Sequence, residues 1–278
     1  MFKIVSKRNL GVNVNEYVID APAVARNARP GQFVILRVEE KGERVPFTIC
    51  DANRIMGTVT ILVQTVGATT RKLAALKEGD YIPTFVGPLG NPTELSHYNG
   101  VLLIAGGIGS AVIYPQAKVL YGIGKPADVI LGARTKDLVM YKRELSAYAK
   151  KLYVMTDDGS DGEQGFVTQK LKELLEGGAR YEMVMAVGPL GMMKAVCEVT
   201  KQYNIPTTVS MNSVMVDGTG MCGGCRLTVG GKTRYACVDG PEFDGHLVDF
   251  DEAMARASFY KNIEKDHLCK LREAGNEN

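Results

Sequence analysis

Residues 101–110 read Val-Leu-Leu-Ile-Ala-Gly-Gly-Ile-Gly-Ser. The apolar run is typical of a strand buried on both faces, and the glycines after it indicate a tight turn into a helix. Further apolar runs follow at residues 129–132, 152–156 and 183–187, with 207–211 as a fifth candidate. Segments with helical spacing lie between them, at 111–120, 136–150, 168–176 and 192–203. This alternation predicts a doubly wound parallel sheet, which binds ligands at the carboxyl ends of its strands.

The chain before this α/β region has a different texture. Short β-branched runs occur at residues 12–18, 32–38, 57–64 and 80–85, separated by turns such as Arg29-Pro30-Gly31. Only residues 70–76 have helical spacing. Several short strands at close intervals predict a small antiparallel β-barrel.

The chain after the α/β region changes again, into a glycine- and cysteine-rich segment with two short strands at 226–229 and 233–237. From Asp249 onward it reads as a helix that begins with carboxylates, which suit a helix N-terminus. We therefore expect a barrel at 1–97, an α/β domain at 98–212, a small module at 213–248 and a helical tail at 249–278.

Composition limits the class of protein. The 278 residues are 45% hydrophobic and 23% charged, which excludes a disordered chain, a collagen and a coiled coil. A net charge of +2, from 33 basic and 31 acidic side chains that are scattered, gives no basic stripe for nucleic acid. No apolar run is long enough to span a membrane and no signal-peptide core is present, so a cytoplasmic protein is expected.

The cysteines carry the most specific chemistry. Three of the six lie in one segment with the spacing Asp217-x4-Cys222-x2-Cys225-x11-Cys237, rich in glycine. Plant-type [2Fe–2S] proteins use Cys-x4-Cys-x2-Cys and a distant fourth cysteine, so Asp217 occupies the place of the first thiolate. Glycines also let backbone N–H groups approach cluster sulfurs closely.

A zinc site is the competing interpretation. Cys222, Cys225, Cys237 and His246 could form a tetrahedral Cys₃His set. The spacing favours the cluster, because the aspartate falls in the register of the missing cysteine. Cys50, Cys197 and Cys269 stand alone, and the sequence assigns them no role.

Two other segments suit cofactors more weakly. Arg44-Val45-Pro46-Phe47-Thr48 could pair a phosphate and hydrogen-bond a flat ring, because alternate side chains of a strand share a face. The glycine turn at 106–111 could receive a pyrophosphate on its amides, although it lacks the third glycine of G-x-G-x-x-G. The second strand of the α/β region ends in Arg134 instead of an acidic residue for a ribose, and Asp157 is a further candidate contact.

Taken together, the three segments resemble the ferredoxin-reductase superfamily, and within it the iron–sulfur flavoproteins related to the electron-transfer subunit of dihydroorotate dehydrogenase. The resemblance covers almost the whole chain. It implies an FAD-binding barrel, an NAD(H)-binding α/β domain and a C-terminal [2Fe–2S] module.

The resemblance also implies a role for individual residues. Thr48 would meet the flavin N5 edge and is the candidate catalytic residue. The implied cofactor contacts are Arg44, Val45, Pro46, Phe47, Thr48, Leu62, Val63, Gln64, Thr69 and Thr70 for FAD, and Gly106, Gly107, Gly109, Ser110, Arg134, Asp157, Gly188 and Pro189 for the nucleotide. The implied iron ligands are Asp217, Cys222, Cys225 and Cys237. Thr69 stands where the family usually has glycine.

The aspartate narrows the resemblance further. Asp217 with three cysteines is similar to the small subunits of NADH-dependent reduced ferredoxin:NADP⁺ oxidoreductases, also called sulfide dehydrogenases. That likeness implies an electron-bifurcating heterodimer with a larger subunit carrying FAD and [4Fe–4S] clusters, and ferredoxin and NADP(H) as indirect partners. Two alternatives stay open: the electron-transfer subunit of NAD-dependent dihydroorotate dehydrogenase, and a non-catalytic, zinc-stabilised nucleotide-binding subunit.

Overall fold

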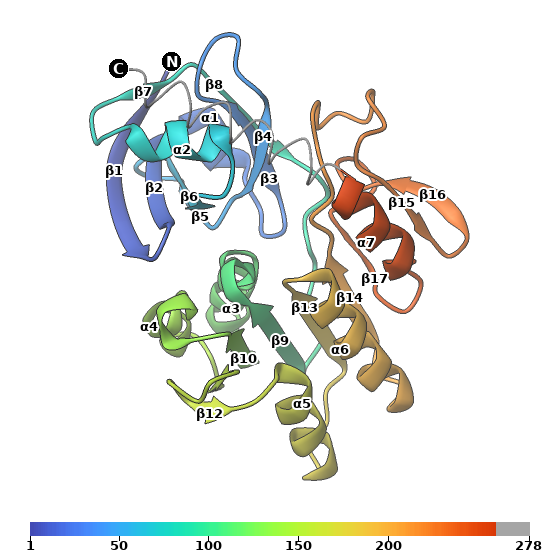
Figure 1. Cartoon of the computed structure of the whole chain (residues 1–278). Helices are drawn as coiled ribbons and strands as arrows, with labels where there is room; N and C mark the ends of the chain where they lie inside the picture. The colour runs from blue at the N-terminus through green and yellow to red at the C-terminus, as the bar shows by residue number, and fades with distance from the viewer. Residues whose placement is uncertain (260–278) are drawn as a thin grey trace.

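The computed structural model describes residues 1–259 of the chain. Figure 1 shows a mainly β unit above an α/β unit, with the cysteine-rich segment beside both. The three parts follow the order expected from the sequence. Within the described residues, no helix is long and apolar enough to cross a membrane.

The N-terminal unit consists of two antiparallel sheets around one core. One sheet has the order β5 (Asp51–Asn53), β6 (Thr58–Gln64), β2 (Val14–Asp20), β1 (Phe2–Gly11) and β7 (Tyr81–Ile82), and the other the order β4 (Val45–Thr48), β3 (Phe33–Arg37) and β8 (Thr84–Leu89). Side chains from both sheets, including Ile4, Ile61 and Leu36, share a single buried cluster. In the part of the chain that the structure describes, no backbone ladder joins the two sheets to each other. The unit is therefore barrel-like, and closure of a full barrel by hydrogen bonds stays a prediction.

Three elements of this unit, β1, α1 (Pro22–Asn27) and β5, were not expected. Strand β1 is half polar and partly exposed, so its sequence lacks the apolar run by which the other strands are recognised. Helix α1 has six residues and begins with a proline, and such short segments read as turns. Helix α2 (Ala68–Ala75) lies close to the predicted 70–76.

The α/β unit is built on a mostly parallel sheet, as predicted, with seven strands where the sequence indicated four and a fifth candidate. Its order is β12 (Glu163–Gln164), β11 (Lys151–Thr156), β10 (Asp128–Ala133), β9 (Val101–Gly106), β13 (Met183–Val187), β14 (Thr207–Ser210) and β17 (Glu242–Asp244). All neighbours pair in parallel except β14 and β17.

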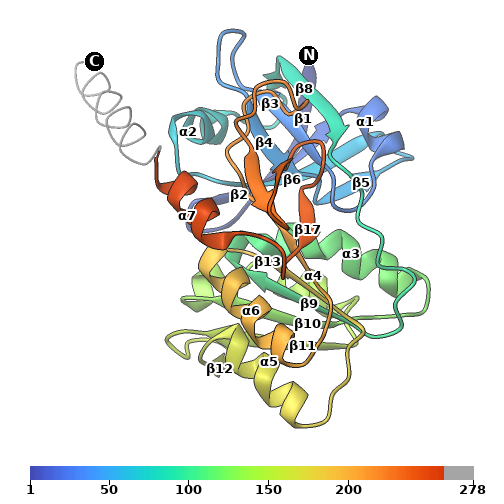
Figure 2. The ribbon, with the colours of Figure 1, turned by 90° about the vertical axis from the view of Figure 1, so that its right-hand side faces the viewer.

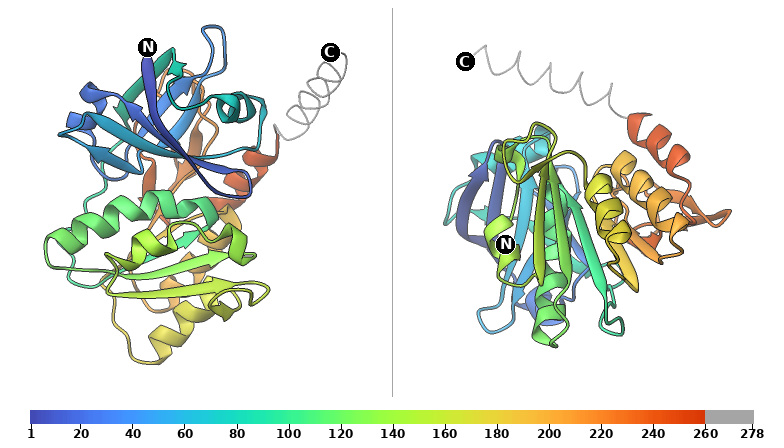
Figure 3. Two further views of the ribbon diagram at one scale, coloured as in Figure 1. Left: turned by 90° about the vertical axis from the view of Figure 1, so that its left-hand side faces the viewer. Right: turned by 90° about the horizontal axis from the view of Figure 1, so that it is seen from below.

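Helices cover both faces of this sheet (Figures 2 and 3). They are α3 (Ser110–Gly122) and α4 (Lys142–Ser146) on one face, and α5 (Val167–Glu176) and α6 (Leu190–Gln202) on the other. Leu102 and Ile104 of β9 belong to one buried cluster, and Leu103 and Ala105 to the other. The continuous apolar run of β9 therefore reflects burial on both faces.

The helix predicted at 136–150 was wrong in extent. The segment forms a short 3₁₀ turn, η2 (Lys136–Leu138), and the five-residue helix α4. Tyr141 separates them with a left-handed φ of 58°, a conformation that interrupts a helix. The predicted tail begins as α7 (Phe250–Phe259), and its remainder, with Cys269, lies outside the described residues.

The cysteine-rich segment is joined to the nucleotide sheet. It forms the hairpin β15 (Arg226–Val229) and β16 (Lys232–Tyr235), and then adds β17 to the sheet edge, with Thr208 opposite Asp244 and Ser210 opposite Glu242. Cys225 and Cys237 share a buried cluster with residues of the α/β unit and with Phe33 and Ile35 of β3. The segment is therefore packed against both larger units.

The two larger units also contact each other directly. Arg8 Nη2 donates to Glu16 Oε2 at 3.1 Å and to Glu144 Oε1 of α4 at 3.0 Å. The Tyr141 hydroxyl donates to the same Glu16 carboxylate. Lys118 of α3 pairs with Asp51 of β5 at 2.7 Å. These contacts fix the barrel-like unit against the face of the sheet that α3 and α4 cover.

A buried carboxyl lies where all three parts meet. Glu242 of β17 accepts a hydrogen bond from Thr93, in the linker that follows β8, and a Cβ on Gly31 would lie 3.0 Å from Glu242 Oε1. That Oε1 atom is buried and has no partner among the described residues. Burial raises the pKa of Glu242 to about 7, and the Thr93 hydrogen bond offsets this only in part.

We predict that this carboxyl makes folding pH-dependent. Because its folded pKa is raised, Glu242 stabilises the fold fully below its unfolded pKa, and this contribution is lost as pH rises through about 7. Glu242→Gln should remove about 2 kcal/mol of the decline in unfolding free energy between pH 5 and pH 8. Urea unfolding across this range measures it, with the exposed Glu40→Gln as control. Parallel profiles for wild type and Glu242→Gln would contradict the role.

Candidate functional site

The carboxyl ends of the central strands meet at one edge of the α/β sheet. Gly106 at the end of β9 is opposite Gly132 of β10, and Ala105 is opposite Val187 of β13. The strand order reverses between β9 and β13, since β10 and β11 continue to one side and β14 to the other. In open α/β sheets this reversal is where ligands bind. The predicted nucleotide turn therefore has the expected place in the fold.

Glycines allow the turns after β9 and β13 to pack backbone against backbone. A Cβ on Gly109 would lie 2.3 Å from the Val187 carbonyl oxygen, and one on Gly188 would lie 3.0 Å from Gly106 Cα. Gly107 has a φ of +55°, a left-handed conformation that favours glycine. Gly109, which directly precedes α3, provides a close backbone approach of the kind for which dinucleotide-binding sites use their third glycine.

The start of α3 continues directly from a 3₁₀ turn, η1 (Gly107–Gly109). Gly109 precedes the helix without a side-chain hydrogen bond, and the Ser110 amide donates to the Gly107 and Ile108 carbonyls, so amides for a ligand would come from the turn before Ser110. The Ser110 side chain is fully buried, and its Oγ has no partner among the described residues. The hydroxyl is enclosed and the Ser110 amide is hydrogen-bonded within the turn, so Ser110 packs the turn, and its contact with a nucleotide stays a prediction.

The other predicted nucleotide contacts lie at the same edge. Arg134 and Asp157 directly follow β10 and β11, and both are exposed. The Asp157 amide donates to the Ala133 carbonyl at 3.1 Å, which holds the two turns together. Pro189 is exposed after β13. The edge thus combines a glycine turn, one guanidinium and one carboxylate.

The predicted flavin segment lies on neighbouring strands of the barrel-like unit. Thr48 ends β4, opposite Phe33, and the whole of β4 (with Val45, Pro46 and Phe47) is half-buried. On β6, Leu62 and Val63 are buried and Gln64 is exposed. Arg44 directly precedes β4 and is half-exposed. A guanidinium, a hydroxyl and an amide thus accompany an apolar strand, a donor set that suits a flat, phosphate-bearing cofactor such as FAD.

Thr69 and Thr70 prove to have local partners. Thr70 Oγ1 accepts from the amides of Val66 at 3.0 Å and Gly67 at 2.9 Å and so caps α2. Thr69 Oγ1 donates to Glu43 at 2.8 Å. The Thr70 side chain is therefore committed to helix capping.

The flavin strand and the nucleotide turn belong to one neighbourhood. Cys50, two residues after Thr48, and Leu62 of β6 share a buried cluster with Ala105 and Ala111 on either side of the glycine turn. The structure thus brings the two predicted cofactor segments together, and it gives Cys50 a packing role.

Two of the predicted iron ligands are adjacent. The sulfurs of Cys225 and Cys237 are 3.2 Å apart, and both residues are buried. The Cys237 amide donates to the Cys225 sulfur at 3.4 Å. Burial, and then the neighbouring Cys225, raise the pKa of the Cys237 thiol to about 12.

Cys222 has a different environment, because it is exposed. The Gly224 amide donates to its sulfur at 3.5 Å, and a Cβ on Gly224 would lie at that same distance from the sulfur. The amides of Gly224, Asp217 and Val216 lower the pKa of the Cys222 thiol. Backbone N–H groups around thiolates are what a cluster site requires.

Asp217 lies beside Cys222 on the same loop. Its Oδ2 accepts from the Thr219 hydroxyl, from the Thr219 amide at 3.0 Å and from the Met221 amide at 3.2 Å. Its Oδ1 lies 3.7 Å from Arg44 Nη1. The Thr219 hydroxyl and amide, with the Met221 amide and the Arg44 charge, hold the pKa of this carboxyl below its usual range.

These residues suit a two-iron cluster better than a single metal ion. Within residues 1–259, no three side chains of histidine, cysteine, aspartate or glutamate are close enough to hold one ion. In a [2Fe–2S] cluster two irons share four ligands, and the loop provides two pairs, Cys225 with Cys237 and Asp217 with Cys222. His246, the fourth zinc ligand of the alternative reading, has its Nε2 3.0 Å from the Thr200 hydroxyl.

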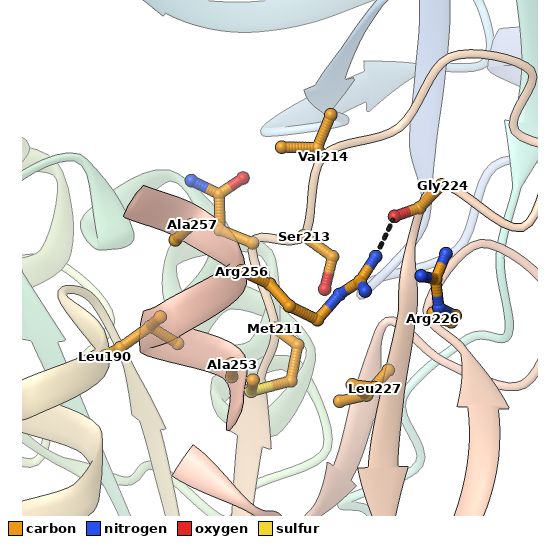
Figure 4. A pocket seen from close by; sticks show the side chains of 11 residues that line it. Leu190, Met211, Ser213, Val214, Gly224, Arg226, Leu227, Ala253, Arg256 and Ala257 are labelled. Carbon is orange, nitrogen blue, oxygen red and sulfur yellow. Dashed lines mark hydrogen bonds between the residues drawn. The ribbon is translucent and has the colours of Figure 1, made fainter. Parts of the chain in front are cut away.

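A pocket lies behind the cysteine loop (Figure 4). It is lined by α7, β15 and the chain after β14, and contains none of the predicted flavin residues. Arg256 of α7 reaches across it and donates to the Gly224 carbonyl at 3.2 Å. Helix α7 therefore braces the loop between Cys222 and Cys225.

Sequence reasoning did not identify two of these contributors, Thr219 and Arg256. The Asp-Gly-Thr order at 217–219 carries a usable signal, because an aspartate often accepts from the residue two positions on. Nothing in the sequence indicates that Arg256, in the C-terminal helix, contacts Gly224.

Comparison with known proteins places these features in a family. The model of the iron–sulfur cluster binding domain of dihydroorotate dehydrogenase B matches residues 212–249, and that of the oxidoreductase NAD-binding domain matches 103–198. A Clostridium beijerinckii protein from the adh 3′ region, described as uncharacterized, is 51% identical over 98% of this chain and 95% of its own. A Thermotoga maritima homolog of the electron-transfer subunit of dihydroorotate dehydrogenase B (NAD⁺) is 45% identical over 95% and 93%.

Two solved structures are similar to this chain in fold. A chain from the structure of an NADH-dependent reduced ferredoxin-NADP oxidoreductase, studied for flavin-based electron bifurcation, has a TM-score of 0.91 and 43% identity, and covers 97% of this chain and 98% of its own. Phthalate dioxygenase reductase, at 16% identity over 82% of this chain and 85% of its own, shares the fold with a TM-score of 0.60.

We predict that Gly109→Ala damages the glycine turn. A Cβ there would lie 2.3 Å from a backbone oxygen that cannot move away without shifting β13. The expected loss in unfolding free energy is about 2 kcal/mol or more, with weaker NADH binding. Gly191→Ala in α6 is the matched control, because its Cβ would meet nothing within 4 Å. Equal melting temperatures and NADH affinities for both variants would refute the packing argument.

Proposed function

The chain belongs to the family of dihydroorotate dehydrogenase B electron-transfer subunits and their homologues, and we propose that it transfers electrons between NAD(H) and a partner through FAD and a [2Fe–2S] cluster. When bound, FAD exchanges a hydride with the nicotinamide and single electrons with the cluster. The observation that carries the proposal is the meeting of three predicted sites: Leu62 of β6, a predicted flavin contact, shares a buried cluster with residues flanking the glycine turn, and Arg44 contacts Asp217 of the cysteine loop.

At the nucleotide site, the chain would bind pyrophosphate through backbone amides of the turn that Gly106, Gly107 and Gly109 form before Ser110. Gly188 and Pro189 would form the opposite wall. Arg134 and Asp157 would contact the ribose, and the Arg134 guanidinium would also donate hydrogen bonds to a 2′-phosphate.

At the flavin site, β4 would orient the ring. Arg44 would pair the diphosphate, and Thr48 would hydrogen-bond the N5 edge that faces the nicotinamide. Leu62, Val63 and Gln64 of β6 would pack against or hydrogen-bond the flavin. Thr69 and Thr70 would act through the helix they begin, since both hydroxyls have protein partners.

At the cluster site, Cys225 and Cys237 would bind one iron and Asp217 and Cys222 the other. The proposed division of the chain is a flavin unit at 1–97, a nucleotide unit at 98–212, a cluster module at 213–248 and a tail at 249–278.

The Thermotoga maritima relative is described as a homolog of an electron-transfer subunit, which supports a larger assembly. The likeness to the bifurcating oxidoreductase supports a heterodimer with a larger FAD and [4Fe–4S] subunit, linked to ferredoxin and NADP(H). The alternative is the electron-transfer subunit of dihydroorotate dehydrogenase, favoured by the name of the Thermotoga maritima relative.

The visible spectrum of anaerobically purified protein tests the proposed cofactors. We expect flavin and [2Fe–2S] absorption that bleaches on addition of NADH, with one FAD and two irons per chain. A colourless protein containing zinc would support the non-catalytic alternative. Purification from its own cell under anaerobic conditions, followed by identification of the bound subunit, separates the two oxidoreductase complexes.

We predict that Thr48→Val slows flavin reduction and leaves FAD bound. The change keeps the shape of the side chain and removes one hydrogen bond, so a loss of roughly tenfold in rate is expected. Stopped-flow absorbance with NADH measures this rate, and FAD content is measured after denaturation. Thr58→Val, at the far end of the neighbouring strand β6, is the control. Unchanged reduction kinetics in Thr48→Val would exclude the role at N5.

A further inference from the structure

One ion pair connects the predicted flavin and cluster sites. Arg44 Nη1 lies 3.7 Å from Asp217 Oδ1, and the two side chains are 47% and 21% exposed. Arg44 immediately precedes β4 and Asp217 begins the cysteine loop. The pair therefore joins residues far apart in the sequence, at the boundary of two different cofactor sites.

The carboxylate in this pair is held in a fixed orientation. Oδ2 accepts three hydrogen bonds from Thr219 and Met221 of its own loop, which leaves Oδ1 for Arg44. Since the loop engages one oxygen and the flavin unit the other, the Asp217 side chain has little rotational freedom.

The backbone beside Asp217 is docked on the flavin unit. Gly218 has a φ of +79°, and a Cβ there would lie 2.8 Å from Ile35 Cγ1 and 3.2 Å from Leu89 Cδ1. Ile35 of β3 pairs with Pro46 of β4, two residues from Arg44. Close packing between the cysteine loop and the sheet that contains β4 thus supports the ion pair.

Stability alone does not explain such a pair, because ion pairs this exposed contribute about 0–1 kcal/mol. A guanidinium has five N–H donors in a planar fork, so one arginine can serve two acceptors at once. Near a cluster, a positive charge favours the reduced, more negative state.

We propose that Arg44 is a positioning residue for Asp217: it holds the aspartate ligand toward the flavin unit and raises the reduction potential of the cluster through their ion pair. This inference rests on the proposed function. One side of the guanidinium would contact the FAD diphosphate and the other Asp217, so a single side chain would adjust both redox sites. The arrangement depends on the carboxylate, because a cysteine at 217 would have no second acceptor oxygen for Arg44.

A double-mutant cycle tests the proposal. The four proteins are wild type, R44Q, D217C and R44Q/D217C, each purified anaerobically with saturating FAD. Midpoint potentials of the cluster come from redox titrations followed by electron paramagnetic resonance, so the readout is independent of turnover. R44Q should shift the potential negative in the Asp217 protein, and by less than half as much in the D217C background.

Two outcomes would overturn the proposal: equal shifts in both backgrounds, which indicate a long-range charge effect without an ion pair, or no shift in either. R44K provides a second test if R44Q retains too little FAD. Lysine keeps the charge, so its potential should lie closer to wild type than that of R44Q, and coincidence with R44Q would also count against the pair.

Failure of the proposed function can be distinguished from failure of the role of Arg44. A wild-type protein that contains no flavin or [2Fe–2S] signal would refute that function before any variant is compared. A wild type with both cofactors but an additive cycle would refute only the role of Arg44.

Discussion

The position of the cysteine-rich segment depends on the antiparallel pairing of β17, a strand of three residues, with β14, the last parallel strand of the sheet. This contact closes the base of the cysteine loop, since Ser210 is opposite Glu242 and the Met211 amide donates to the Pro241 carbonyl at 2.9 Å. Everything between these points, including all four proposed iron ligands, is thereby confined to one place beside the flavin unit. The entropy cost of closing a loop rises only slowly with its length. The short strand can therefore order a long segment that has little regular structure of its own.

The relative orientation of the two larger units follows from side-chain contacts between the barrel-like unit and the face of the sheet that α3 and α4 cover. Hydride transfer requires that donor and acceptor atoms be held within a narrow range of distance and angle. The Glu16 carboxylate receives hydrogen bonds from Arg8 within its own unit and from Tyr141 of the other. Tyr141 keeps its left-handed backbone in a buried position, where Tyr114 packs edge-on against its ring. The nucleotide edge and the flavin strand are therefore related by specific side-chain contacts in addition to apolar burial.

Much of this arrangement could be predicted from local sequence. The apolar runs of β9 and β13 and the glycines at 106–109 determine a switch-point site, because burial and close backbone approach impose these residue types. The cysteine spacing indicates a cluster for a similar reason. Strand β17 could not be foreseen, since Glu-Phe-Asp is too short for a period and its pairing is tertiary. The contacts of Arg44 with Asp217 and of Arg256 with Gly224 likewise join distant segments, and Tyr141 interrupts a helical pattern through a backbone angle that tyrosine rarely adopts.

The edges of the seven-stranded sheet have a consequence for association. Its outermost strands, β12 and β17, contain two and three residues, and carry the exposed Glu163 and Asp244. An exposed strand edge is a template on which another chain can add a strand, and brevity and charge are the usual protections. At β12 and β17, brevity and charge thus disfavour pairing between copies of the chain. The remaining edge is residues 151–154 of β11, which β12 does not pair, and it begins with the exposed Lys151, a residue type that also disfavours edge pairing.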